Sequence, residues 1–245
     1  MGHKKMAFKI GLYGVVYAIA ILLNYYLLKK HLEKNNRSEE LAYTSAIYLS
    51  LGLLLGARAL FVVYYNPAYY LKNPLEIFFF WQGGMSFHGG LIGIMLAGYF
   101  LCKKYSIPFL KIADIISFTA PLFLFLGRIA NFLNNELPGK ITNVPWCINI
   151  LGYEGCRHPT TLYDAIKNLF IFAILLKLSK KNHQPGILFL TLIFTYSLGR
   201  LIIDFWRDYP STFLGISSGQ YLNLITLIIS GVFLLKLATK KQKCK

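Results

Sequence analysis

The 245-residue chain has little charge, and few of its charged residues are acidic. Charged residues make up 15% of the sequence, whereas roughly 25% is usual in soluble domains. The 10 Asp and Glu residues are outnumbered by 26 Lys and Arg. Long stretches have no charge at all, at residues 10–28, 41–57, 77–102 and 209–235. About 20 apolar residues span the hydrocarbon core of a bilayer, so the sequence predicts a polytopic membrane protein.

Several common sequence signals are missing. No small-residue cleavage site follows the first apolar stretch, so we expect no cleavable signal peptide. The chain has no serine in a nucleophile elbow, no HExxH motif and no P-loop. It also has no internal repeat and no low-complexity linker. We therefore expect a single membrane domain over residues 1–245, without an evident nucleophile of its own.

The four cysteines leave several alternatives. Cys147 and Cys156 share one loop, but they do not have CxxC spacing. A disulfide between them, or no role for either, is favoured over a zinc site that would also use His158. We expect no metal and no cofactor.

The net charge of +16 raises the question of nucleic-acid binding. The lysines, however, lie in the gaps between the apolar stretches. That placement is typical of topology signals and of contacts with anionic lipid headgroups. We expect membrane lipids as partners and no nucleic acid.

Hydropathy predicts an all-α fold with about seven transmembrane helices. The predicted spans are residues 10–28, 42–63, 86–102, 111–128, 161–178, 186–204 and 219–238. Lys and Arg concentrate in alternate connections and in the tail, which places the C-terminus in the cytoplasm and the N-terminus outside. Only Lys4, Lys5 and Lys9 oppose this orientation. The outer loops are expected at about 64–86, 129–160 and 205–218, with a short interfacial helix at 75–82.

Polar side chains gather at the outer ends of several spans, where ionisable groups are candidates for function. They are Arg58, His88, Arg128, Asn131, Glu136, Arg157, His158, Tyr163, Asp164, Tyr196, Arg200, Asp204 and Arg207, with Tyr13 near the outer end of the first span. Arg128, Asn131 and Asn135 are expected on one helix face. Simpler explanations exist, since Arg200 and Asp204 have the spacing of a helix ion pair. Asp164 with Lys167 is interpreted as a structural pair, and Arg58 could snorkel to headgroups.

The convergence of these groups on one side favours a functional site. Arginine forks match phosphate oxygens bidentately, and histidine is suited to moving a proton near neutral pH. An enzyme that transfers a group directly from a phospholipid-like substrate to a second substrate would use both kinds of side chain. The alternatives are a non-enzymatic phospholipid-binding or lipid-translocating protein, and a different head-group transferase.

Four motifs in order resemble the bacterial prolipoprotein diacylglyceryl transferases. They are residues 85–93 (MSFHGGLIG), 127–136 (GRIANFLNNE), 157–164 (RHPTTLYD) and 199–207 (GRLIIDFWR). Residues 56–58 (GAR), followed by 64–67 (YYNP), add to the resemblance. The match covers all seven predicted spans.

The resemblance implies an enzyme of the cytoplasmic (inner) membrane, with its active site toward the periplasm. Such an enzyme moves the diacylglyceryl group of phosphatidylglycerol onto the lipobox cysteine of a prolipoprotein, forming a thioether and releasing glycerol 1-phosphate. It implies His88 as the base, with Tyr13 assisting. The residues implied to bind phosphatidylglycerol are Arg58, Arg128, Asn131, Glu136, Gly139, Tyr196, Arg200, Asp204 and Arg207. Among them Arg128 and Arg200 would clamp the phosphate and count as catalytic.

The remaining assignments and the departures also come from the resemblance. Asn131 and Glu136 would hold headgroup hydroxyls or orient Arg128, Gly139 would shape a turn, and Tyr196 would assist in proton transfer. The family usually has Gly at positions 130 and 135, Glu at 204 and Ser-Gln at 160–161, where this chain has Ala, Asn, Asp and Thr-Thr. Asn tolerates a positive φ better than most residues, whereas the Asp is one methylene shorter than Glu.

Overall fold

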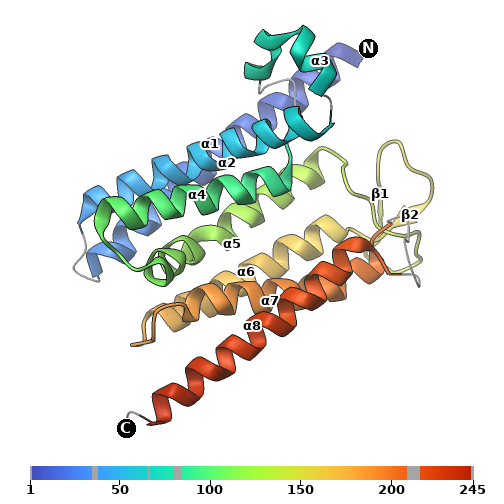
Figure 1. The fold of residues 1–245 in the computed structure, drawn as a ribbon. Helices are drawn as coiled ribbons and strands as arrows, with labels where there is room; N and C mark the ends of the chain where they lie inside the picture. The colour runs from blue at the N-terminus through green and yellow to red at the C-terminus, as the bar shows by residue number, and fades with distance from the viewer. Residues whose placement is uncertain (1, 35–37, 66, 80–83, 209–215, 244–245) are drawn as a thin grey trace. The chain divides into compact units, whose positions relative to one another are not determined.

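The computed structural model describes residues 2–34, 38–65, 67–79, 84–208 and 216–243 (Figure 1). Within these ranges, the side chains of residues 2–13, 17, 65, 87, 88, 218 and 238–243 are outside the description. Contacts divide the chain into two compact units, Met1–Ile112 and Ala113–Lys245. A single domain over the whole chain stays a prediction.

The described residues include seven helices of 17 residues or more, one at each predicted span. They are α1 (Gly2–Lys34), α2 (Glu39–Tyr65), α4 (Phe87–Tyr105), α5 (Phe109–Leu133), α6 (Thr160–Ser179), α7 (Ile187–Ile203) and α8 (Ser218–Lys243). The described chain is therefore mostly helical, which fits the predicted all-α fold.

Five segments of the described chain are long and apolar enough to cross a membrane. They are Gly14–Lys34, Glu39–Tyr64, Phe109–Leu133, Ile187–Trp206 and Gly219–Leu237. The predicted span in α6 carries three charged residues, Asp164, Lys167 and Lys177, and α4 contains four glycines and two lysines. A multi-pass membrane protein fits these findings, while the count of seven spans and the orientation of the termini stay predictions.

In the first unit, α2 and α4 lie side by side and pack through glycines (Figure 1). Gly52 and Gly56 of α2 face Gly89 and Gly93 of α4. A Cβ on Gly93 would overlap the Gly52 carbonyl oxygen and lie 2.7 Å from the Gly52 carbonyl carbon. Such small residues let two helix backbones approach closely, as is common in membrane interfaces.

Two short helices follow α2 in the first unit, α3 (Pro67–Lys72) and η1 (Pro74–Phe78). The short helix predicted at 75–82 is confirmed for residues 75–78, and residues 80–82 lie outside the described part. The side chain of Arg58 binds this segment. Its Nη2 donates to the carbonyl of Glu76 at 2.6 Å and its Nε to that of Ile77 at 2.9 Å.

The second unit contains α6, α7 and α8 and nearly all of α5. Ile171 and Leu175 of α6 pack in its core against Leu188 and Leu192 of α7. Asp114 of α5 holds the start of α7, because its two carboxylate oxygens accept from the amides of Gly186 and Phe189 at 2.7 and 2.9 Å. Those amides are among the donors that a helix N-terminus leaves without a partner inside the helix.

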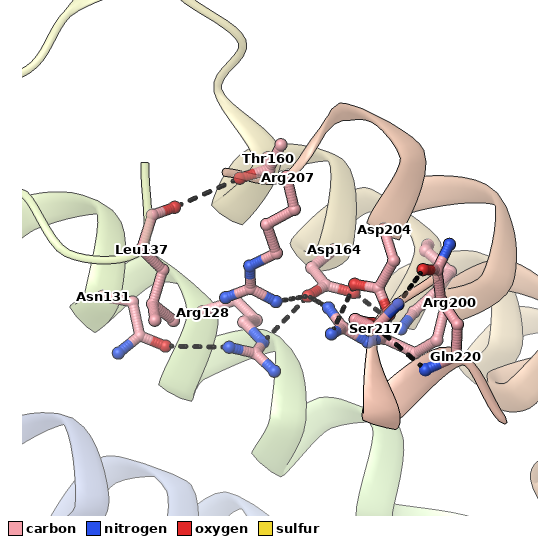
Figure 2. Close-up of polar contacts among 11 residues, drawn as sticks. Arg128, Asn131, Leu137, Thr160, Asp164, Arg200, Asp204, Arg207, Ser217 and Gln220 are labelled. Atoms are coloured by element: carbon pink, nitrogen blue, oxygen red, sulfur yellow. Dashed lines mark hydrogen bonds and ion pairs between the residues drawn. The ribbon is translucent and has the colours of Figure 1, made fainter. Parts of the chain in front are cut away.

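The start of α8 is fixed by a reciprocal cap. The Ser217 amide donates to Gln220 Oε1 at 2.9 Å, and the Gln220 amide donates to Ser217 Oγ at 3.3 Å. This is the capping-box arrangement, which satisfies two amide donors at once. It lies beside the polar cluster of this unit (Figure 2).

A small sheet connects α5 to α6. Strands β1 (Ile148–Asn149) and β2 (Cys156–Arg157) pair antiparallel. Single bridges continue the pairing from Arg157 to Ile141 and from Gly139 to Arg207. A disulfide joins Cys147 to Cys156, with the two Cα atoms 5.5 Å apart. Of the alternatives left open by the cysteines, the disulfide is confirmed, and the zinc site is wrong because both thiols are used.

Candidate functional site

A buried carboxylate, Asp164, is the centre of the polar cluster in the second unit (Figure 2). It lies in the second turn of α6. Its Oδ1 is 2.8 Å from Lys167 Nζ. Its Oδ2 is 2.6 Å from Arg200 Nη1 and 3.2 Å from Arg128 Nε, while Arg207 Nη1 is 3.6 Å away. The predicted pair with Lys167 is confirmed, but it is one of four cationic contacts.

The four cations come from different parts of the unit. Arg128 belongs to α5 and Lys167 to α6, Arg200 lies in the last turn of α7, and Arg207 directly follows η3 (Asp204–Trp206). One buried carboxylate therefore ties three helices and a loop together.

A second carboxylate, Asp204, extends the cluster. Its Oδ1 is 2.6 Å from Arg200 Nη2, which confirms the predicted i,i+4 ion pair. Asp204 is one methylene shorter than the Glu that is usual at this position in the family that the sequence resembles. Its side chain still reaches Arg200. Arg200 is consequently held by Asp164 at one Nη and by Asp204 at the other.

The cluster carries an excess of positive charge. Among the described residues that form it, four side chains are positive (Arg128, Lys167, Arg200 and Arg207) and two are negative (Asp164 and Asp204). The net formal charge is +2. Arg128 has a side chain 20% exposed, compared with 9% for Arg200 and 2% for Arg207. A buried charge is costly unless a counter-charge meets it, so this cluster is suited to an anionic group.

A polar chain leads away from Arg128. Its Nη1 donates to Asn131 Oδ1 at 3.3 Å, and Asn131 Nδ2 donates to Glu136 Oε2 at 2.9 Å. Arg128 and Asn131 share a face of α5, as their spacing predicts. This geometry fits the interpretation in which Asn131 and Glu136 orient Arg128.

The expectation for Asn135 was wrong, because it does not continue the face of α5. The helix ends at Leu133, and Asn135 and Leu137 have φ of 55° and 56°. Asn135 therefore adopts the left-handed conformation that Gly or Asn accepts most readily. Its Oδ1 accepts from the Leu151 amide at 3.3 Å, which ties the turn to the loop after β1.

A half-open pocket of about 460 Å³ lies next to this turn. Its lining combines apolar and polar side chains: Phe132, Leu133, Asn135, Glu136, Ile148, Asn149, Ile150 and Thr161. Glu136 belongs both to the pocket and to the polar chain that ends at Arg128. The pocket can therefore take a small polar group with an apolar portion beside it.

Gly139 was expected to shape a turn, but the structure places it in an extended segment. It forms a bridge with Arg207, and its carbonyl accepts from Arg157 Nη1 at 2.9 Å. A Cβ at this position would overlap the carbonyl oxygen of His158 and lie 2.9 Å from Thr160 Cγ2. Gly139 is thus required by the close approach of another backbone segment.

The structure gathers most of the predicted site residues of the second unit. Arg128, Asn131, Glu136, Arg200, Asp204 and Arg207 form the cluster and its polar extension, and Gly139 pairs with Arg207. Tyr196 joins through Lys167, whose Nζ is 4.0 Å from the centre of its ring.

Three predicted residues belong to the first unit. The side chains of Tyr13 and His88 lie outside the described residues. Arg58 is buried, and besides the carbonyls of Glu76 and Ile77 it binds that of Gly84 at 3.2 Å. Snorkelling to headgroups is therefore wrong for Arg58, and its part in substrate binding stays a prediction.

The sequence placed Asp164 among the polar groups at the outer ends of the spans, but its pair with Lys167 was interpreted as structural and neither residue was assigned to the site. A usable signal was the excess of arginines among the candidates, because a buried arginine needs a carboxylate partner. As for metals, the described residues contain no group of three or more His, Cys, Asp and Glu side chains placed to bind an ion.

The comparisons with known proteins agree with the sequence resemblance. A family model described as prolipoprotein diacylglyceryl transferase matches residues 3–236. Three similar proteins are named phosphatidylglycerol–prolipoprotein diacylglyceryl transferase. The one from Geobacter sulfurreducens is 36% identical over 85% of this chain and 82% of its own length. Those from Rickettsia canadensis and Bordetella avium are 39% and 36% identical, over 91% and 94% of this chain and 90% of each relative.

Proposed function

The chain belongs to the prolipoprotein diacylglyceryl transferase family, and we propose that it transfers the diacylglyceryl group of phosphatidylglycerol to the lipobox cysteine of prolipoproteins. The products are a thioether-linked lipoprotein precursor and glycerol 1-phosphate. One structural observation carries the proposal, namely the gathering of three arginines and a lysine around the buried Asp164. Its excess positive charge suits the phosphate of the lipid.

The reaction changes the charge of that phosphate. The cysteine sulfur attacks the glyceryl carbon that is bonded to a phosphate oxygen, so a C–S bond forms and the C–O bond breaks. The electron pair of the broken bond stays on the phosphate oxygen, and the thiol proton passes to a base. A phosphodiester with one negative charge thus becomes a monoester, which carries up to two negative charges near neutral pH. Groups that stabilise the additional charge lower the barrier.

The roles of individual residues follow from this chemistry and from the family resemblance. Arg128 and Arg200 bind the phosphate and stabilise the charge that develops on it, while Asn131 and Glu136 hold Arg128 in place. A free thiol has a pKa of about 8.5, so a base is needed. His88 takes that role, with Tyr13 and Tyr196 assisting. No cofactor is required.

The placement in the membrane is part of the same proposal. The chain crosses the bacterial inner membrane about seven times, with its C-terminus in the cytoplasm and its site toward the periplasm. The lysines in alternate connections support this orientation. A reporter that is active only in the cytoplasm should give a signal when fused after Lys245 and none when fused before Met1.

A transfer assay tests the function directly. Membranes that contain the protein are incubated with labelled phosphatidylglycerol and a lipobox peptide, and the product is examined for thioether-linked lipid. A peptide with Ser in place of the acceptor Cys is the control. If the folded protein binds the lipid but leaves the peptide unmodified, a non-enzymatic phospholipid-binding function is supported instead.

Two substitutions test the assigned roles. Arg128→Lys keeps the charge but loses the bidentate fork, and we expect kcat/KM for phosphatidylglycerol to fall by a factor of about 10². His88→Asn should abolish transfer if His88 is the base, whereas retained activity would remove it from that role. Complementation of a strain depleted of its own transferase tests substrate and activity together.

A further inference from the structure

Lys167 is a buried cation of the cluster to which neither the proposed mechanism nor the family motifs assign a role of its own. It lies in α6, with a side chain that is 11% exposed. Its Nζ is 2.8 Å from Asp164 Oδ1 and 4.0 Å from the centre of the Tyr196 ring. A lysine inside an apolar helix is costly and marks a functional candidate. The carboxylate and the face of the aromatic ring both offset that cost.

The neighbouring helix leaves space for this side chain. Gly199 of α7 faces Lys167, and a Cβ there would overlap Lys167 Cδ and lie 2.7 Å from its Cγ. Because Gly199 has no side chain, the four-carbon stem of Lys167 can pass α7 and reach Asp164. The contact thus depends on residues of two helices.

The two oxygens of Asp164 have different partners. Oδ1 faces Lys167, and Oδ2 faces Arg128, Arg200 and Arg207. The ammonium on Oδ1 fixes the orientation of the carboxylate, so that Oδ2 is directed at the three guanidinium groups. Without Lys167 the net formal charge of the cluster would be +1 instead of +2.

We propose that Lys167 is a positioning residue for diacylglyceryl transfer. It orients Asp164 and supplies the second excess positive charge of the cluster. The inference rests on the proposed function, in which the phosphate gains one negative charge as the C–O bond breaks. A cluster of charge +2 matches the leaving glycerol 1-phosphate dianion better than the monoanionic lipid. Lys167 therefore favours the transition state over the bound substrate.

The first test is Lys167→Met, which keeps most of the length of the side chain and removes its charge. We expect kcat to fall about tenfold, with a smaller rise in the KM for phosphatidylglycerol in mixed micelles. The inhibition constant of glycerol 1-phosphate should rise by more than that KM, because the dianion loses more attraction than the monoanion. Lys167→Arg restores the charge and should recover most of kcat. Lys177→Met removes an exposed charge from the same helix and should change nothing.

The second test uses Gly199. Gly199→Ala displaces the stem of Lys167 while leaving every charge in place, and we expect it to reproduce part of the loss in kcat. In a Lys167→Ala background, where the stem is absent, the same substitution should have no further effect. This non-additivity is what two residues in direct contact produce.

The outcomes separate the inference from the function on which it rests. If the wild-type protein transfers no lipid, the proposed function fails. If the wild-type protein is active and Lys167→Met has the same kcat, the positioning role is refuted. A fall in kcat with KM and the glycerol 1-phosphate inhibition constant unchanged would mean only that less enzyme is folded, and would also overturn the inference. Additive effects of Gly199→Ala and Lys167→Ala would refute the contact.

Discussion

Asp164→Asn is the substitution for which the structure makes the sharpest prediction. Asn has nearly the same shape as Asp, so the change removes the charge of the side chain and little of its volume. Four positive side chains would then face one remaining carboxylate, Asp204, and the net formal charge of the cluster would rise from +2 to +3.

The size of the effect follows from the distances. An ion pair at about 4 Å is worth roughly 4 kcal/mol at an effective dielectric constant near 20. Asp164 has four cationic partners, the farthest of them at 3.6 Å, so the gross attraction is on the order of 16 kcal/mol. Desolvation of the carboxylate offsets several kcal/mol of this, and removing one member of a buried pair typically costs about 3–5 kcal/mol. We expect a loss of about 4 kcal/mol in unfolding free energy.

That loss is measurable by thermal unfolding in detergent. A change of 1 kcal/mol shifts the midpoint of a domain of this size by roughly 2–4 °C, so Asp164→Asn should lower it by about 10 °C. Asp208→Asn is the matched control, because Asp208 binds Arg157 at 2.8 Å but is 52% exposed. Exposed pairs contribute about 1 kcal/mol or less.

The comparison of Asp164→Asn with Asp208→Asn decides whether Asp164 stabilises the cluster. If Asp164→Asn shifts the midpoint no more than Asp208→Asn, Asp164 does not hold the cluster together. A second comparison adds Lys167→Met to Asp164→Asn, which returns the net formal charge to +2. The double variant should be more stable than Asp164→Asn alone, since one uncompensated buried charge has been removed.

Three further predictions concern the packing and the turns. Gly93→Ala should lower the thermal midpoint, because its Cβ would meet the backbone of Gly52, whereas Gly127→Ala, with no atom of another segment within 4 Å, should not. At Asn135, whose φ is 55°, we expect Gly to be tolerated and Val to cost about 1–3 kcal/mol in chemical denaturation. Asp114→Ala removes the acceptor for two amides of the first turn of α7, so these amides should exchange hydrogen faster, by a factor that corresponds to roughly 1–2 kcal/mol.

Much of the helical fold could be predicted from hydropathy, but the helix ends could not. The predicted span at 111–128 stops where the polar residues begin, yet α5 continues to Leu133. Hydropathy records the membrane environment, whereas a helix ends where the backbone turns. Here the turn comes at Asn134 and Asn135, the second of which has a positive φ.

The candidate site could be predicted where its contacts are local. The i,i+4 spacing of Arg200 and Asp204 anticipates their ion pair, and the i,i+3 spacing of Asp164 and Lys167 anticipates theirs. Spacing along one helix carries no information about contacts between helices. Arg128 and Arg200 each lie 36 residues from Asp164 along the chain, so their contacts with it came only from the structure.

The geometry also distinguishes the two arginines that the sequence treats alike. Arg200 is held at both Nη atoms by carboxylates, at 2.6 Å each, and its side chain is 9% exposed. Arg128 is 20% exposed, and it makes its contact with Asp164 through Nε. The fork of Arg128 is consequently the more accessible of the two, while Arg200 is fixed deeper in the cluster. We expect the phosphate of the lipid to meet Arg128 first, so that Arg128→Lys acts mainly on KM and Arg200→Lys mainly on kcat and stability.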